Sequence, residues 1–104
     1  MQTSKQKSFA EVIKSDTPVL ADFYTTWCGP CKMMTPILKD LKKMMGDRIT
    51  IIKIDAEKNP EAAAKYQIRG VPTLILFQNG KIKWQQAGVM QANQLKNIIE
   101  NNTN

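Results

Sequence analysis

The sequence predicts an α/β fold in which a central mixed β-sheet of four strands has helices on both faces. Two observations predict it. A strand, a helix and a second strand follow one another between residues 18 and 54, and a strong hairpin signal lies at Asn79-Gly80. The 104 residues, 42% of them apolar, are enough for one domain with a core. We therefore expect a single domain over residues 1–104, with residues 1–7 as a short fifth strand or disordered and residues 101–104 as a frayed tail.

The first half of the chain carries the strand–helix–strand order. The stretch SFAE from Ser8 is a capping box, which predicts a helix to about residue 15. Residues 18–24, PVLADFY, predict a buried strand, and residues 49–54, ITIIKI, predict a second one beside it. The helix between them follows WCGPC and ends at Gly46, and its apolar residues recur at helical spacing: Met34, Ile37, Leu38, Leu41 and Met45.

The second half predicts, in order, a helix over residues 59–67, strands over 73–77 and 82–87, and a helix over 92–100. Asn59 followed by Pro60 is typical of a helix start, because the amide side chain caps and proline suits the first turn. Asn79-Gly80 joins the two strands as a hairpin, since both residues tolerate the positive φ that a tight turn needs.

The charge pattern bears on possible partners. Fifteen Lys and Arg against nine Asp and Glu give a net charge of +6. The basic residues are scattered, with no run longer than Lys42-Lys43 and no interleaved aromatic residues, so a solvated basic surface is favoured over a nucleic-acid site. No stretch approaches the roughly 18 apolar residues of a membrane span, and no apolar run follows the basic N-terminus. We expect a soluble cytoplasmic protein without membrane or nucleic-acid partners.

The only two cysteines, Cys28 and Cys31, stand three positions apart. A disulfide across two intervening residues closes almost no loop, so it would stabilise the fold little. A structural zinc site takes four ligands, and the chain has no histidine and no second cysteine pair. A zinc site would therefore need carboxylate ligands, or ligands shared between copies of the chain in an oligomer. A Cys-His hydrolase is excluded, because the chain has no histidine. The pattern favours redox chemistry, with no metal.

The spacing places the two sulfurs at the mouth of the long helix. Cys28 precedes a first turn that contains Pro30, so free N–H groups and the helix dipole should lower the pKa of its thiol below about 8.5. We expect Cys28 to be exposed and to be the attacking atom. Cys31 lies one turn further, with β-carbons about 5–6 Å apart, so the pair can close a disulfide.

Two charged residues interrupt the predicted strands. Asp22 lies within an apolar strand just before the cysteines, where burial would raise the pKa of its carboxyl and suit proton transfer with Cys31. The alternative is a carboxylate satisfied by backbone N–H groups. Lys53 interrupts the apolar stretch ITIIKI. The alternative is a structural feature: a charge on the solvated face of the strand or at its end.

The stretches ADFYTTWCGPCKMMTPIL and RGVPTLILFQNG resemble the thioredoxin family, and the resemblance covers nearly the whole chain from Ser8. It implies the thioredoxin fold and reduction of disulfides in cytoplasmic proteins, with Cys28 attacking a substrate disulfide and Cys31 resolving the mixed disulfide. It further implies a monomer that binds no cofactor, takes electrons from NADPH through thioredoxin reductase, and has disulfide-containing proteins as substrates.

The resemblance also implies roles for other residues. Asp22 corresponds to the buried acid of the family, and Lys53 to the lysine that accompanies it. Pro72 corresponds to a cis-proline that faces the sulfurs, with the backbone of Val71 pairing with an extended substrate. The substrate surface would comprise Trp27, Val71, Pro72 and Gly88, while Gly29 and Pro30 would tune the redox potential.

Two other functions fit the same residues. One is a non-catalytic interaction subunit that uses its basic surface. The other is a disulfide oxidase or isomerase, although the Gly29-Pro30 dipeptide and the absence of a signal peptide argue against it. The chain also departs from the family pattern, because seven residues before Ser8 are short for a first strand, which we expect to be abbreviated or absent.

Overall fold

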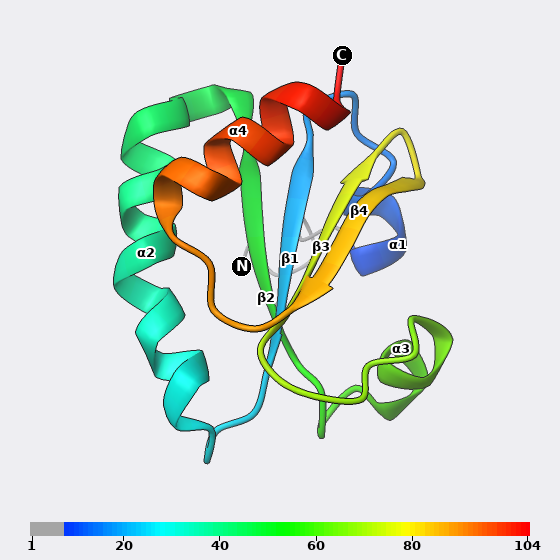
Figure 1. Cartoon of the computed structure of the whole chain (residues 1–104). Helices are drawn as coiled ribbons and strands as arrows, with labels where there is room; N and C mark the ends of the chain where they lie inside the picture. The colour runs from blue at the N-terminus through cyan, green and yellow to red at the C-terminus, as the bar shows by residue number, and fades with distance from the viewer. Residues whose placement is uncertain (1–7) are drawn as a thin grey trace, which may run out of the picture.

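The computed structural model describes residues 8–104, and Figure 1 shows the arrangement of its elements. The expectation for residues 1–7 lies outside this range. The elements in chain order are α1 (Phe9–Val12), β1 (Val19–Tyr24), α2 (Gly29–Met45), a 3-10 turn (Gly46–Arg48), β2 (Thr50–Asp55), α3 (Pro60–Lys65), β3 (Thr73–Gln78), β4 (Lys81–Ala87) and α4 (Ala92–Asn102). The first helix is shorter than predicted, and the other elements lie within a few residues of their predicted bounds.

The four strands form one mixed sheet in the order β2-β1-β3-β4. Strand β1 pairs parallel to β2 and antiparallel to β3, and β3 pairs antiparallel to β4 through the predicted hairpin. Asn79 and Gly80 have φ values of 55° and 80°, as a tight turn with positive φ requires. The predicted fold, a four-stranded mixed sheet with flanking helices, is confirmed.

Two apolar cores lie on opposite faces of the sheet. On one face, α2 and α4 pack on the sheet through residues that include Met34, Leu41 and Leu95. On the other face, the aromatic residues Phe9 and Tyr66 anchor α1 and α3 against Phe77. Among the described residues, no helix has both the length and the apolar character that a membrane span requires.

The strand β1 is the buried centre of the sheet, and its side chains alternate between the two faces. Leu20 belongs to the core under α2 and α4, whereas Ala21 and Phe23 belong to the opposite core. Because side chains two positions apart share a face, Asp22 points to the same side as Leu20. The fold therefore directs this carboxyl group beneath the helix that carries the cysteines.

The C-terminal tail differs from the predicted frayed segment. Helix α4 continues to Asn102, and the Thr103 hydroxyl donates a hydrogen bond to the Ile99 carbonyl at 2.6 Å. The Asn104 N–H donates to the side-chain oxygen of Gln78 at 3.1 Å. These bonds satisfy groups that a free helix end would leave to water, whereas the sequence led us to expect a frayed tail over residues 101–104.

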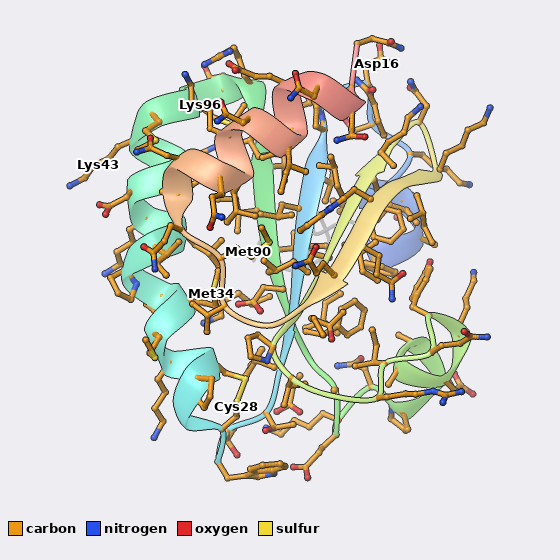
Figure 2. All side chains as sticks on the ribbon, viewed as in Figure 1. Asp16, Cys28, Met34, Lys43, Met90 and Lys96 are labelled. Carbon is orange, nitrogen blue, oxygen red and sulfur yellow. A yellow bond between two sulfur atoms is a disulfide. The ribbon has the colours of Figure 1, made fainter. Side chains whose placement is uncertain are left out.

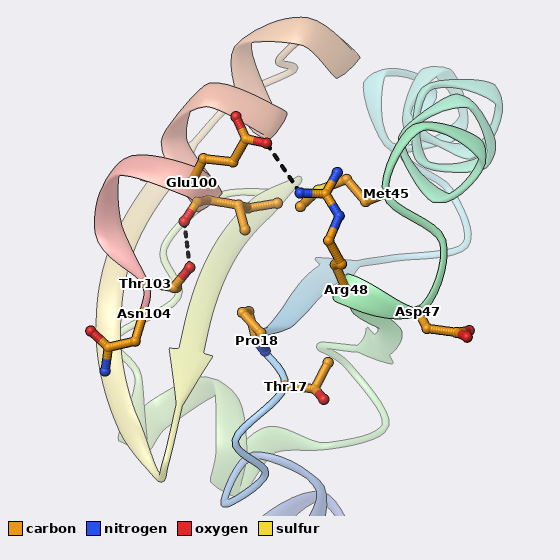
Figure 3. A pocket seen from close by; sticks show the side chains of 9 residues that line it. Thr17, Pro18, Met45, Asp47, Arg48, Glu100, Thr103 and Asn104 are labelled. Carbon is orange, nitrogen blue, oxygen red and sulfur yellow. Dashed lines mark hydrogen bonds and ion pairs between the residues drawn. The ribbon is translucent and has the colours of Figure 1, made fainter.

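An ion pair ties the same helix to the turn that follows α2. In Figure 3, the Arg48 guanidinium reaches the Glu100 carboxylate, at 3.3 Å. Both side chains are well exposed, so the pair contributes little stability, about 0–1 kcal/mol. Its place at the far end of α2 separates it from the cysteines.

Candidate active site

The two cysteines form a disulfide at the N-terminal end of α2, with Cα atoms 5.3 Å apart (Figure 2). Cys28 is the N-cap residue, with extended backbone at φ −89° and ψ 114°, and Pro30 lies in the first turn. Its sulfur accepts a hydrogen bond from the Cys31 N–H at 3.1 Å. The helix start thus points an N–H group at the Cys28 sulfur, as the sequence predicted.

The exposure of Cys28 differs from the prediction. The side chains of Cys28 and Cys31 are both buried, with only 4% and 3% of their surfaces exposed. The sulfur of Cys28 lies 3.7 Å from the carbonyl oxygen of Val71, so a loop far along the chain covers it. Cys28 nevertheless lines a surface groove.

The loop that covers Cys28 contains two of the predicted site residues, Val71 and Pro72. The Val71–Pro72 peptide bond is cis. The Pro72 carbonyl accepts a hydrogen bond from the Gly88 N–H at 2.8 Å, and Gly88 has a φ of 104°, which suits glycine. The Thr73 hydroxyl donates to the Gly70 carbonyl at 2.6 Å. Val71 therefore lies beside Cys28, and the hydrogen bond from Gly88 joins the neighbouring Pro72 to the residue that follows β4.

A shallow groove of about 420 Å³ opens next to the disulfide. It is lined by Trp27, Cys28, Gly29, Pro30, Glu57 and Val71, among others. The Trp27 side chain is 69% exposed, which is unusual for so large an apolar group. Its indole N–H donates a hydrogen bond to the Glu57 carboxylate at 2.9 Å. Glu57 was not predicted from the sequence, because no local pattern links two residues that stand thirty positions apart.

The Asp22 carboxyl group is fully buried. Neither of its oxygens accepts a hydrogen bond from the part of the chain that the structure describes. Burial raises the pKa of Asp22 from its ordinary 3.8 to about 6, and the nearby Lys53 charge lowers it in part. The alternative of a carboxylate satisfied by the backbone is therefore wrong, and the raised pKa is as expected.

Lys53 lies opposite Asp22 in the register of β1 and β2. Its ammonium group donates a hydrogen bond to the Thr35 hydroxyl on α2 at 3.3 Å and lies 5.1 Å from the centre of the Tyr24 ring. The side chain is exposed and makes no ion pair with Asp22 within the described residues. Lys53 therefore acts on Asp22 through its charge and not through contact.

A second buried polar group lies beside the cysteines. The Thr25 hydroxyl has no hydrogen-bond partner among the described residues, and the Thr25 carbonyl accepts the Cys28 N–H at 3.4 Å. Buried polar groups without partners cost free energy and are rare in native folds. Two such groups, on Asp22 and Thr25, therefore distinguish this end of β1.

Across the described chain, no group of three or more His, Cys, Asp or Glu side chains is arranged to hold a metal ion.

Comparison with known proteins gives a consistent result. The family model described as thioredoxin matches residues 1–101. A thioredoxin from Rickettsia bellii is 45% identical over 97 residues, which cover 92% of each chain. Thioredoxin Y2, chloroplastic, from Arabidopsis thaliana is 50% identical over 95 residues, 90% of this chain. Among solved structures, a mutant thioredoxin from Halobacterium salinarum superposes with a TM-score of 0.84 at 37% identity, covering 95% of this chain and 86% of that one.

The lengths of these relatives differ. The chain spans 57% of the Arabidopsis protein and 61% of thioredoxin Y, chloroplastic, from rice, which is 48% identical. It spans nearly the whole of the Rickettsia protein. The similarity therefore spans nearly the whole length of some relatives and less than two thirds of others.

Proposed function

The chain belongs to the thioredoxin family, and on that premise we propose that it reduces disulfides in other proteins through the Cys28–Cys31 pair. The observation that carries the proposal is the disulfide at the start of α2, with Cys28 at the edge of an open groove. A dithiol in this position can attack a substrate and return to the disulfide state that the structure shows.

The first step forms a mixed disulfide. In the reduced protein, the Cys28 thiolate attacks one sulfur of a substrate disulfide, and the other substrate sulfur leaves as a thiolate that takes up a proton. The N–H of Cys31, which points at the Cys28 sulfur in the disulfide form, would stabilise the attacking thiolate together with the helix dipole. No cofactor is needed for this exchange.

The second step releases the substrate. The Cys31 thiol loses its proton and attacks the Cys28 sulfur, so the mixed disulfide breaks and the second substrate sulfur leaves with a proton. The substrate gains two electrons and two protons, and the protein is left as the disulfide. Cys31 is suited to this role, because it does not line the groove and its Cα atom lies 5.3 Å from that of Cys28.

Asp22 would accept the proton that Cys31 releases. Its pKa of about 6 lies close enough to neutral pH for it both to gain and to lose a proton there. Its oxygens are free of other hydrogen bonds from the described chain, so they are available to a bridging water or to a shifted thiol. Lys53 would tune this pKa through its charge, since it touches neither sulfur.

The groove would hold the substrate. Trp27 provides exposed apolar surface next to Cys28, and the Val71 backbone offers an edge with which an extended segment can pair. Pro72 and Gly88 would shape the Val71 loop through the hydrogen bond between them. Gly29 and Pro30 would tune the redox potential from within the CxxC motif and leave the groove open, because neither carries a long side chain.

The remaining parts of the proposal concern the cellular context. A protein that ends each cycle as a disulfide needs a reductant, and we assign this role to thioredoxin reductase with electrons from NADPH. The chain is proposed to act as a monomeric single domain in the cytoplasm, without membrane or nucleic-acid partners. These points come from the family and from the sequence.

Insulin reduction with NADPH and a bacterial thioredoxin reductase tests the proposal. The chain should reduce insulin, seen as NADPH consumption and precipitation of the freed B chain, and Cys28→Ser should abolish both. Dithiothreitol in place of the reductase separates failed recognition by the reductase from failed chemistry. A folded chain that is inactive with both reductants would contradict the proposed activity.

The two rival functions give different results. A non-catalytic subunit would bind its partner equally well after Cys28→Ser and Cys31→Ser, with an affinity that falls steeply with salt. An oxidase would show a markedly higher reduction potential than a reductase, measured against a glutathione buffer.

A further inference from the structure

A surface pocket of about 500 Å³ lies apart from the two cysteines. Three segments form it: the end of α1 with the residues that follow, the end of α3, and the hairpin turn between β3 and β4. These segments lie together at the right of Figure 1, and none of the lining residues belongs to the groove beside Cys28. The pocket is therefore separate from the proposed site of disulfide exchange.

Hydrogen bonds and ring contacts hold these segments together. The N–H groups of residues 79 and 80, in the hairpin turn, donate to the carbonyls of Ser15 and Ile13 at 2.9 and 2.8 Å. The ring of Tyr66, at the end of α3, contacts the ring of Phe77 edge-on, with the two centroids 5.4 Å apart. The pocket is therefore formed before any ligand binds, as small-molecule sites usually are.

The floor of the pocket is apolar. Phe77 and Ile13 are buried beneath it, and Tyr66 is half-buried. Ile82, on β4, lines the pocket with 49% of its surface exposed, a large fraction for an aliphatic side chain. A ligand that covers this surface would remove it from water, which favours binding.

The rim of the pocket is basic. Each segment contributes one lysine, Lys14, Lys65 and Lys81, and no described acidic residue lines the pocket. None of the three ammonium groups forms an ion pair with a described residue. The Lys65 ammonium lies 5.5 Å from the centre of the Tyr66 ring, so this charge lies beside the apolar floor. Residues 1–7, MQTSKQK, include two lysines and no acid, so they add no carboxylate to the rim wherever they lie.

One acidic residue lies near the rim. Glu61 lines a smaller hollow next to the pocket, together with Lys65, but forms no ion pair with it. Even if the Glu61 charge offsets that of Lys65, the charges of Lys14 and Lys81 remain. The pocket therefore combines an apolar floor with positive charge that the described chain does not balance.

We propose that this pocket binds a small amphipathic anion, in which an apolar group bears a carboxylate or a phosphate. The apolar group would cover Tyr66 and Ile82, and the anionic group would accept hydrogen bonds from the lysines of the rim. A neutral apolar ligand would leave the lysines unpaired, and inorganic phosphate would leave the floor exposed. This binding goes beyond the proposed exchange reaction, because it requires neither cysteine.

The shape of the site argues against two larger occupants. A nucleic acid binds along an extended track of positive charges that follows its phosphates, whereas these lysines surround one hollow. A stable complex with an acidic protein buries about 1,200 Å² or more, and the apolar surface here is confined to a single pocket. The volume of about 500 Å³ lies within the usual range for small-molecule sites.

Fluorescence titration of the full chain tests the proposal. The probe is 1-anilinonaphthalene-8-sulfonate, whose rings represent the apolar group and whose sulfonate represents the carboxylate or phosphate. Its neutral parent, 1-anilinonaphthalene, is the control. The sulfonate should bind about threefold or more tightly than the parent at low salt, and high salt should remove this advantage by screening the lysines. Equal affinities at low salt, or no binding of the sulfonate, would overturn the proposal.

Nuclear magnetic resonance locates the bound probe. Saturating sulfonate should shift the amide signals of Lys14, Lys65 and Ile82 and leave those of Trp27 and Cys28 unchanged. If the shifts lie at the groove beside Cys28, or anywhere else outside the pocket, the proposal is wrong.

A matched pair of variants tests the role of the lysines. Lys65→Gln, in the last turn of α3, should weaken binding of the sulfonate about threefold to tenfold. Lys43→Gln removes the same charge from the last turn of α2, but Lys43 extends away from the body of the protein (Figure 2) and does not line the pocket, so it should have little effect. Equal losses in the two variants would indicate general attraction to a basic protein and overturn the proposal.

Competition identifies the class of ligand. Decanoate offers an aliphatic chain with a carboxylate, and phenyl phosphate offers an aromatic ring with a phosphate. Displacement of the sulfonate by either compound would support the proposal and show which chemistry the pocket prefers. Displacement by neither would show that the pocket takes the dye only, and stronger displacement by an Asp-rich peptide or a single-stranded oligonucleotide would assign the site to a macromolecule. Both of these results would overturn the proposal.

Discussion

Two buried aspartates on neighbouring parallel strands, Asp22 on β1 and Asp55 on β2, are treated very differently by the fold. Only 0% and 8% of their surfaces are exposed. One carboxylate oxygen of Asp55 accepts the N–H groups of Glu57 and Lys58, at 2.9 and 3.1 Å. The oxygens of Asp22 accept no hydrogen bond from the described chain.

The difference separates a structural acid from one suited to chemistry. Asp55 orders the turn that presents Glu57 to the Trp27 indole, so it builds the wall of the groove. Asp22 contributes no such bond, and its burial makes the ionised state costly. An apolar residue would stabilise β1 better at this position. The unpartnered carboxyl group is what the proposed proton transfer from Cys31 requires.

The largest expected effect concerns the two cysteine sulfurs. The role given to Asp22 requires that Cys28 attacks the substrate and that Cys31 resolves the mixed disulfide. With Cys31→Ser, attack by Cys28 proceeds but resolution fails, so substrate proteins should accumulate as covalent adducts. With Cys28→Ser, few adducts should form, because the remaining thiol lacks the N-cap position and does not line the groove. Non-reducing gels with and without dithiothreitol measure the adducts. Equal trapping by the two variants would mean that the attacker and the resolver are wrongly assigned.

The next effect concerns the rate of exchange in Asp22→Asn. The amide cannot accept a proton, so resolution by Cys31 should slow by about tenfold or more at neutral pH, within the usual range for loss of general acid–base catalysis. The dependence of the rate on pH near 6 should also disappear. Stopped-flow kinetics from pH 5 to 9 measure both. An unchanged profile would remove Asp22 from the mechanism.

The same substitution should stabilise the fold. The folded pKa of Asp22, about 6, lies above the unfolded value of 3.8, so the folded state binds more protons between these values. This group therefore lowers stability as pH rises from about 4 to about 6, and the cost stays constant above that range. Asp22→Asn should raise the free energy of unfolding by up to about 3 kcal/mol at pH 8 and by little below pH 4. Urea unfolding at both pH values measures the gain, and a loss of stability at pH 8 would contradict it.

Asp55→Ala should have the opposite and smaller effect. Loss of the acceptor leaves two backbone N–H groups without their partner, so the free energy of unfolding should fall by about 1–2 kcal/mol. The profile of exchange rate against pH should keep its shape, because Asp55 does not take part in proton transfer. A changed profile in this variant would show that the two aspartates do not have separate roles.

Local sequence signals predicted most of the fold. The hairpin at Asn79-Gly80 and the helix end at Gly46 depend on backbone conformations that few residues tolerate, so single positions identify them. Asn59 shows the limit of this reasoning. It stands at the predicted start of α3, but its amide donates to the Asp55 carbonyl at 2.9 Å and does not cap the helix. The choice between these bonds depends on where β2 ends.

The active site was predictable only in part, for a similar reason. The helix start fixes the position of Cys28 and Cys31 within a few residues, and an acid within an apolar strand marks Asp22. The burial of Cys28 under the Val71 loop and the contact between Trp27 and Glu57 depend on residues brought together only by the complete fold. Such contacts leave no periodic pattern in the chain.

The titration of the Asp22 carboxyl group tests whether this residue can act as the proton acceptor for Cys31. In the oxidised protein, the side-chain carboxyl carbon of Asp22, assigned by its loss in Asp22→Asn, is followed by ¹³C NMR between pH 3 and 9. We expect a midpoint near pH 6, because burial without hydrogen bonds from the described chain disfavours the charged form. A midpoint near the ordinary 3.8 would show that the carboxylate is well solvated or paired, and would contradict its role as a proton acceptor.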